Sequence, residues 1–458
     1  MTRTPDQVLR ASSLQRLANR KAARGFTLIE ISVALIAGLI VSLAVVAMSR
    51  DATNTFHEEA RSAAAESALR VAIDRLRNDL SRAGFMSSPN LAPPVVAGVN
   101  DTGRDPTVVS AYTPPTSGQI RKIAGIRLYN KGSEKIANVV GAEVAPTIKG
   151  TDEGSVTLSN QNGVHPDMID ITGNFTTADS YTVQTIQTGS AVGGTCTSGD
   201  RLVLAGYTAA SYRVTGVASA AGLAAMEAAF RPGNANGIIR IVDDTGRTQY
   251  AVACNTGITV GTPANPYVDI NGSVVMGSAD GVGGLKGFAS GRAMINPVTT
   301  VRWRIAPRTE YTAYAKLDDT SDSTRFDLYR SFVSAAGTES AADAELIAEY
   351  AVDLKFAFTS DEANVMPFGS GPTVTSYAFD TTSSSALAAT QRVRSVRARL
   401  ATRAALPDRT KDLPTPVGAP YLYRYCTEPP ASGPCTKLAR VRTIITEVAL
   451  QNQARVFW

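Results

Sequence analysis

The first strong pattern along the chain is an almost uninterrupted apolar run at positions 26–48, FTLIEISVALIAGLIVSLAVVAM, which contains no proline. A helix of this length rises roughly 34 Å, which is enough to cross the hydrocarbon core of a bilayer. The run therefore predicts a membrane-spanning helix close to the N-terminus.

Apolar residues then return at helical spacing, separated by 4, 3 and 4 positions, in Leu69, Ile73, Leu76 and Leu80. Positions 57–83 are also rich in Ala, Glu and Arg, which favour helices. Since no proline lies between Phe26 and Pro89, the pattern predicts one helix of about 58 residues, from Phe26 to near Ala83, with Gly84 as its C-terminal break.

From about position 120 the chain consists of short segments in which apolar and polar residues alternate, separated by turn-forming clusters. This alternation is typical of antiparallel sheets. We therefore expect an α+β protein, in which a long N-terminal hydrophobic helix packs on an antiparallel β-sheet domain with a large β-rich insertion. The candidate strands are 123–129, 168–172, 181–186, 201–204, 238–242, 301–305, 325–329, 352–358, 393–400 and 440–450.

Two stretches between these strands have a different composition. Residues 86–119 are rich in proline and predict an extended connection, and residues 255–299 are rich in Gly, Ser and Asn and predict a loop. The expected organisation has four parts: a leader at 1–25, the long helix at 26–85, a β-rich inserted region at 86–299 and a C-terminal sheet region at 300–458.

The formal charge of +5, from 45 Lys and Arg against 40 Asp and Glu, is concentrated in the first 25 residues. That segment holds six basic residues and one acidic residue, a difference of 6 − 1 = +5, so the remainder is neutral overall. The positive-inside rule predicts residues 1–25 in the cytoplasm and the body outside. A neutral body argues against bulk attraction to nucleic acid, and we expect none to bind.

The apolar run contains one carboxylate, Glu30, and a basic segment ending in Arg24-Gly25 precedes it. An ordinary secretory signal would instead show small residues at a cleavage site after the apolar region. A charge inside a membrane span costs roughly 2.5–3.5 kcal/mol and is by default a functional hypothesis. The alternative is a plain signal anchor, in which Glu30 lies near the lipid headgroups at little cost.

The hexapeptide G-F-T-L-I-E at positions 25–30 resembles the class III signal of type IV prepilins and type II secretion pseudopilins. The resemblance implies cleavage between Gly25 and Phe26 by a cytoplasmic-side aspartyl prepilin peptidase, followed by N-methylation of Phe26. It also implies that Glu30 pairs with the terminal amine of a neighbouring subunit.

Elementary electrostatics agrees with this assignment. A buried carboxylate needs a cation, and cleavage creates one at Phe26, whose new α-amino group has a reference pKa near 8. In a helical stack of membrane segments, the amine of one subunit can meet Glu30 of another. An uncleaved chain lacks this amine, so processing would be linked to assembly.

Motifs elsewhere resemble the PilW-type minor pilins. These motifs are L-R-N-D-L-S-R-A-G-F at 76–85, V-R-W-R-I at 301–305, V-R-A-R-L at 396–400 and T-E-V-A-L-Q-N at 446–452. The resemblance implies a pilin-like C-terminal sheet. Two departures from major pilins favour a minor subunit: the chain is longer, and Ala47 stands where major pilins often have proline.

The four cysteines, Cys196, Cys254, Cys426 and Cys435, all follow the membrane segment and should meet an oxidising compartment. Four cysteines allow three pairings. Cys426 and Cys435 flank the proline-rich loop TEPPASGP, which a bridge would clamp. The pair Cys196–Cys254 then follows by elimination.

Other chemical signals are weak. The glycine-rich segment at 281–287 lacks the spacing of a phosphate-binding loop, and the acidic run Asp318, Asp319, Asp322 and Asp327 lacks the glycine and terminal glutamate of an EF-hand. The two histidines, His57 and His165, have no evident ligand partner. We therefore expect no catalytic residues, no metal and no cofactor.

One basic cluster lies late in the chain, at Arg392, Arg394, Arg397, Arg399 and Arg403. In a strand, Arg397 and Arg399 share a face, and no aromatic residues interleave with the arginines as stacking platforms for bases. We expect this cluster to form a solvated sheet face or a contact between subunits.

Taken together, the resemblance implies a type IV minor prepilin and not an enzyme. It would be anchored in the inner membrane with its body in the periplasm, and would then join a minor pilin complex at the pilus tip that primes assembly. The family's partners are the major pilin, other minor pilins, a tip adhesin and the inner-membrane assembly platform, and its processes are cell adhesion and twitching motility.

Two alternatives remain. A minor pseudopilin of type II secretion shares the same N-terminal chemistry. A membrane-anchored periplasmic binding module or enzyme, carried by residues 86–299, belongs to a different class of protein.

Overall fold

The computed structural model describes residues 26–91, 107–109, 120, 123–129, 148–149, 155–156, 166–177, 179–191, 193–205, 220–259, 265–277, 284–286, 293–315, 325–340, 342–360, 365–366, 393–407, 424–427 and 437–454. By their contacts the residues divide into two units, Met1–Ala60 and Arg61–Trp458. We call the second unit the body.

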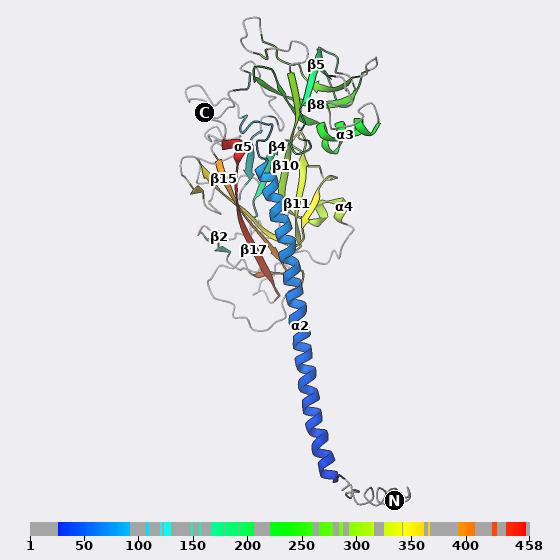
Figure 1. Ribbon diagram of the computed structural model, residues 1–458, viewed down its shortest axis with the longest axis vertical. Helices are drawn as coiled ribbons and strands as arrows, with labels where there is room; N and C mark the ends of the chain where they lie inside the picture. Colours follow the sequence, from blue (N-terminus) through cyan, green and yellow to red (C-terminus); the bar gives the residue numbers. More distant parts are fainter. Residues whose placement is uncertain are drawn as a thin grey trace, which may run out of the picture. The chain divides into compact units, whose positions relative to one another are not determined.

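Helix α2 runs from Leu28 to Ser81, over 54 residues (Figure 1). Apolar side chains in its first part are exposed; Leu35, for example, is 68% exposed. An 18-residue window of this helix has a mean hydropathy of 2.7, and none of it is buried. The chain therefore has a helix near the N-terminus that is long and apolar enough to cross a membrane, as its sequence predicts.

The second part of α2, from Arg61 onward, belongs to the body. Its predicted apolar stripe is buried: Leu69, Leu76 and Leu80 are fully buried and Ile73 is 5% exposed. The helix ends at Ser81, and Gly84 follows in the left-handed region with φ +74°. The predicted break at Gly84 is confirmed, because glycine adopts this conformation at little cost.

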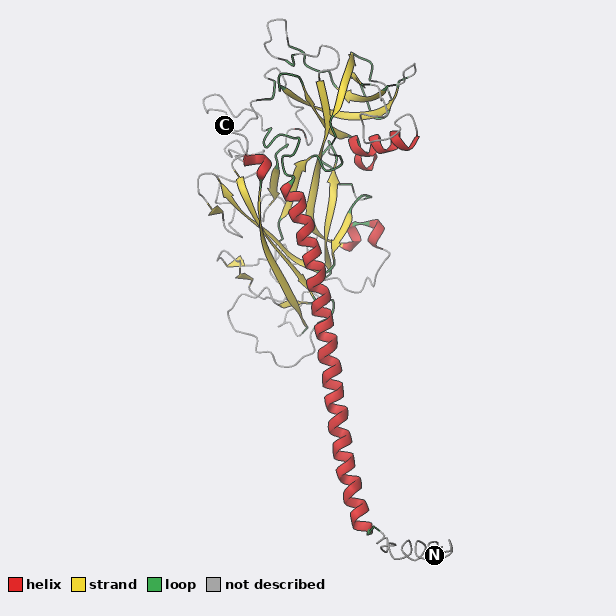
Figure 2. Ribbon diagram, viewed as in Figure 1, coloured by secondary structure: helices red, strands yellow, loops and turns green. Residues whose placement is uncertain are grey.

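One antiparallel sheet of the body has the strand order β14-β13-β15-β17-β16. Figure 2 draws the strands of the body in yellow. Its strands are Val365–Met366, Ala351–Ser360, Val393–Arg403, Leu438–Ala449 and Arg424–Cys426, in the same order.

The other large sheet is organised by β10 (Ala293–Pro307), whose two halves have different neighbours. From Thr299 onward it lies between β4 (Met168–Gly173) and β11 (Phe326–Val333). Two further strands extend this part on its two sides: β1 (Ile126–Tyr129) pairs with β4, and β12 (Glu345–Ala348) pairs with β11.

A single apolar core joins α2 to both sheets. It includes Leu76 from the helix, Trp303 from β10 and Leu400 from β15. The predicted α+β arrangement, with a long helix and antiparallel sheets, is confirmed at this level.

The first half of β10 closes a barrel, because Ala293–Ile295 pairs with β5 (Tyr181–Gln187) and Met294–Val298 pairs with β7 (Gly237–Val242). The circuit runs β5-β6-β9-β8-β7-β10 and back to β5, and every pairing in it is antiparallel. The remaining barrel strands are β6 (Arg201–Leu204), β8 (Thr248–Ile258) and β9 (Pro266–Asn271).

Helix α3 (Ala220–Phe230) lies between β6 and β7 in the chain and contributes Phe230 to a second apolar core, which it shares with the barrel strands. Short elements complete the description: β2 (Ile148–Lys149), β3 (Ser155–Val156), η2 (Pro232–Asn234), η3 (Arg308–Glu310), α4 (Thr312–Ala315) and α5 (Gln451–Ala454).

Each of the ten candidate strands overlaps a strand of the structure. The prediction of a loop over 255–299 is wrong, because this stretch contains the end of β8, all of β9 and the first half of β10. Some of its Gly and Asn residues lie inside strands, with Asn255 and Gly257 in β8 and Asn296 in β10, and composition does not reveal this.

Candidate functional site

The N-terminal end of α2 is closed by a reciprocal side-chain cap. Glu30 Oε2 accepts hydrogen bonds from the Thr27 amide and from Thr27 Oγ1, both at 3.0 Å, and the Glu30 amide donates to Thr27 Oγ1 at 3.3 Å. Ser/Thr at the cap with Glu three positions later is a capping box, which satisfies backbone donors of the first turn. The carboxylate is thereby held at the start of the helix, beside Phe26.

The residues of the predicted processing site are placed only in part. Gly25 lies outside the described residues, and Phe26 is 81% exposed immediately before the helix. The capping role of Thr27 and Glu30 was missed from sequence, although the T-x-x-E spacing signals it.

A second site fixes α2 to the body through a buried carboxylate. Asp79 Oδ2 accepts a hydrogen bond from Trp303 Nε1 at 2.9 Å and one from Arg330 Nε at 2.7 Å. Asp79 is 4% exposed, Trp303 fully buried and Arg330 8% exposed. One helical carboxylate thus binds both β10 and β11, and its charge is compensated inside the core.

The C-terminal end of α2 and the turn after it are hydrogen-bonded to two distant parts of the chain. Asn452 Nδ2 donates to the Ser81 carbonyl at 3.1 Å, and the Gly84 amide donates to the Thr172 carbonyl at 2.8 Å. A side chain at Gly125 would overlap the Gln453 amide, so Gln453 would have to move to accommodate it.

The four segments 76–85, 301–305, 396–400 and 446–452 therefore meet at the second part of α2. Asp79 lies in the first and Trp303 in the second, Val396 and Leu400 of the third line the same core, and Asn452 of the fourth caps the helix. Their common role in the structure is to hold the helix on the body.

The expectation that the arginine cluster forms a solvated sheet face is wrong for Arg399 and Arg403. Arg399 is 2% exposed and donates from Nε to Asp353 Oδ2 at 2.9 Å. Arg403 is 1% exposed and lies over the rings of Tyr350 and Tyr425. Arg397, in contrast, is partly exposed and lies 4.0 Å from Glu447. The strand pattern placed Arg397 and Arg399 on one face correctly, but it could not show that aspartate and aromatic partners bury part of that face.

Another buried ion pair involves the neighbouring strand β13, where Lys355 Nζ is 2.8 Å from Asp167 Oδ1. Burial raises the pKa of Asp167, while the charge of Lys355 opposes this shift. Sequence reasoning singled out neither residue. Asp327 of the acidic run is also buried, between Arg308 and Arg325, while Asp318, Asp319 and Asp322 lie outside the described residues.

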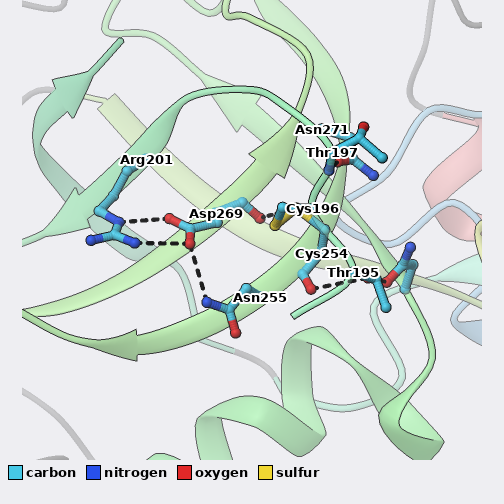
Figure 3. Close-up of a disulfide and its surroundings, with 9 residues drawn as sticks. Thr195, Cys196, Thr197, Arg201, Cys254, Asn255, Asp269 and Asn271 are labelled. Atoms are coloured by element: carbon cyan, nitrogen blue, oxygen red, sulfur yellow. Dashed lines mark hydrogen bonds and ion pairs between the residues drawn. A yellow bond between two sulfur atoms is a disulfide. The ribbon is translucent and has the colours of Figure 1, made fainter. Parts of the chain in front are cut away.

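Cys196 and Cys254 form a disulfide that ties the segment before β6 to β8 of the barrel (Figure 3). The same region contains the ion pair between Arg201 and Asp269, at 2.7 Å, and Asn255 Nδ2 also donates to Asp269. The Cys196–Cys254 disulfide agrees with the pairing that was predicted by elimination. Cys435 lies outside the described residues, so the bridge Cys426–Cys435 stays a prediction.

Non-reducing peptide mapping should recover Cys426 linked to Cys435, together with Cys196 linked to Cys254. Closing a loop of about ten residues stabilises a fold by roughly 2–3 kcal/mol on the chain-entropy model, so Cys426→Ser with Cys435→Ser should lower stability by that amount. Free thiols at both positions in protein extracted without reductant would contradict the prediction.

Within the described part of the chain, no three His, Cys, Asp or Glu residues are arranged to hold a metal ion. His57 lies exposed on α2, and His165 is outside the described residues. No protein-family model, curated protein or solved structure matches this chain.

Proposed function

We propose that this chain is a type IV minor prepilin of the PilW kind, a structural subunit that helps to initiate pilus assembly. The observation that carries the proposal is the sequence G-F-T-L-I-E at 25–30, which leads directly into the apolar part of α2. The continuity of α2 supports it, because a single helix provides both a membrane-length apolar segment and part of the core of the body.

In this function, residues 1–25 are a cytoplasmic leader that a prepilin peptidase removes after Gly25. The new amine at Phe26 carries a positive charge at neutral pH, since its reference pKa is near 8. The Glu30 carboxylate of a neighbouring subunit can then exchange its Thr27 hydrogen bonds for this ammonium group. Loss of one helix cap costs only about 1 kcal/mol, whereas a carboxylate buried without a cation costs far more, so the exchange is favourable inside the assembled pilus.

The other partners follow from the same proposal: the major pilin, further minor pilins, a tip adhesin and the inner-membrane assembly platform. The body would lie in the periplasm, and after assembly at the cell surface, where the pilus serves adhesion and twitching motility. The N-terminal chemistry equally suits a type II secretion pseudopilin. Co-purification with the major pilin, and not with secretion pseudopilins, would separate the two.

Mass spectrometry of the N-terminal peptide from membranes tests the proposal directly. We expect the mature chain to begin at Phe26 and to carry one added methyl group on its amine. Gly25→Val should retain residues 1–25, because the peptidase must then accommodate a branched side chain at the scissile bond. Normal shortening of Gly25→Val, or a mature chain that begins after the apolar run, would overturn the assignment.

A further inference from the structure

Strand β17 has one edge that is paired along its length and a second that is not. On the first edge it pairs with β15 from Val441 to Ala449, without a register shift. On the second edge β16 pairs only with Leu438–Arg440. Among the described residues, no strand pairs with the second edge between Thr443 and Ala449.

Hydrogen bonds at both ends of β17 show which residues face this open edge. The Leu450 amide donates to the Arg394 carbonyl and the Arg440 carbonyl accepts from Ala404, so even-numbered residues face β15. The Lys437 carbonyl accepts from Thr427, so odd-numbered residues face the side of β16. Since backbone direction alternates along a strand, the N–H and C=O groups of Thr443, Ile445, Glu447 and Ala449 point to the open edge.

Within the described part of the chain, this edge has none of the features that normally protect a sheet edge, which are proline, lysine, a bulge or a covering segment. The stretch from 443 to 449 contains no proline and only one charged residue, Glu447, and its pairing with β15 has no bulge. All four outward residues are exposed, and Ile445 is 44% exposed. A flat edge of β-branched residues with unpaired backbone groups is a template for another strand.

We propose that the open edge of β17 accepts an extended segment of a different protein chain, which adds a strand to the sheet. Outward backbone groups repeat every second residue, about 7 Å apart, and only an extended backbone matches this repeat. The open edge from Thr443 to Ala449, which we call the slot, is seven residues or about 23 Å long. Strand β16 pairs with the same edge of β17 at Leu438–Arg440 and so limits the slot at that end. Ile445 selects a β-branched or aromatic residue opposite it, whereas the Glu447 carboxylate already accepts a hydrogen bond from Ser395 Oγ at 2.7 Å and lies 4.0 Å from Arg397.

A second copy of this chain fits the edge less well. A two-fold antiparallel pairing that uses all four outward residues sets Ile445 against Glu447 twice. The register that sets Ile445 against Ile445 places Ala449 opposite Val441, next to the position where β16 begins. The first register pairs an apolar residue with a charged one, and the second loses backbone hydrogen bonds near β16. We therefore assign the slot to a different protein chain.

Hydrogen exchange at single-residue resolution tests the proposal on the full-length chain. In the chain purified alone in detergent, the outward amides of Thr443, Ile445 and Glu447 should exchange at least about tenfold faster than those of Ile444, Thr446 and Val448, which bind β15. In complexes isolated from the cells that produce it, the outward amides should slow by at least about tenfold and the alternation should disappear.

Three outcomes would overturn the proposal: outward amides that stay fast in the complexes, outward amides already protected in the dilute isolated chain, and protection that rises with the concentration of the isolated chain. The last would identify a second copy as the occupant. The result does not depend on the pilus assignment, because leader cleavage and this protection are measured separately.

A matched pair of proline variants adds a genetic test. Ile445→Pro removes only an outward N–H and should leave the melting temperature nearly unchanged while it reduces the protected complex at least about tenfold. Ile444→Pro removes a hydrogen bond to β15 and should destabilise the body. Undiminished protection of Thr443 and Glu447 in the complexes of Ile445→Pro would contradict strand addition.

Discussion

Asp79→Ala should lower the stability of the body by about 3–5 kcal/mol, the cost of removing one partner of a buried ion pair. The substitution leaves the Arg330 guanidinium and the Trp303 N–H without the acceptor they share. The other carboxylate near Arg330, Glu345, is 3.7 Å away and half exposed, so it compensates little. Calorimetry should show a melting temperature lower by about 5–10 °C.

Two variants separate this effect from a general loss of charge on the helix. Asp74, one turn earlier, is exposed and lies 3.7 Å from Arg77. Asp74→Ala should therefore cost less than about 1 kcal/mol. Adding Arg330→Met to Asp79→Ala should recover part of the loss, because no unpaired charge then stays in the core. If Asp79→Ala is as mild as Asp74→Ala, the buried contact does not hold the helix to the sheet.

The helix and the pairing strands could be predicted because each has a strong local period. The spacing of Leu69, Ile73, Leu76 and Leu80 gives the buried face of α2, and Gly84 marks its end. Asp79 carried a further signal, since a carboxylate beside this apolar stripe implies a buried partner. The sequence could not identify Trp303 and Arg330 as the partners, because they lie more than 220 residues away.

The barrel could not be predicted, because its closure depends on long-range pairing. Only the register of β10 with both β5 and β7 shows that six strands form a ring. Strand β8 was missed because Asn255, Thr256 and Gly257 interrupt its alternation, and a register shift lies between Ala253 and Asn255. Helix α3 was missed because AAGLAAMEAAF is apolar on nearly all sides and has no clear 3.6-residue period.

The buried charges of the body show a different limit. Lys and Arg usually lie at the surface, so a strand with five nearby arginines predicts a solvated face. The structure buries Arg399 because Asp353, on the neighbouring strand, neutralises it. Burial of a charge depends on the partner that the fold brings to it, and no local pattern contains that information.

The N-terminal carboxylate allows processing to be separated from assembly. Glu30→Ala removes a charge from the membrane segment, so insertion becomes easier by up to a few kcal/mol. If the proposed function is correct, we expect the variant to accumulate in the membrane and still to lose residues 1–25. A residual defect in methylation of Phe26 is consistent with the proposal, because Glu30 accepts a hydrogen bond from the amide of Thr27, the next residue in the chain.

Incorporation into pili should nevertheless fall. Without the carboxylate, the variant cannot pair with the terminal amine of a neighbour, and losing one side of a buried ion pair costs about 3–5 kcal/mol. The ratio of variant in sheared pili to variant in membranes should therefore drop at least about tenfold relative to the natural chain.

Glu30→Gln sharpens the test, because the amide oxygen can still accept the hydrogen bonds of Thr27 while the charge is lost. If the charge is decisive, Glu30→Gln should be as defective as Glu30→Ala; if helix capping is decisive, it should behave like the natural chain. Ser32→Ala is the control, since Ser32 Oγ only donates to the Leu28 carbonyl at 2.9 Å in the same apolar segment. An unchanged ratio in both Glu30 variants would mean that the subunit joins its neighbours through the body alone, with Glu30 acting as the cap of a plain membrane anchor.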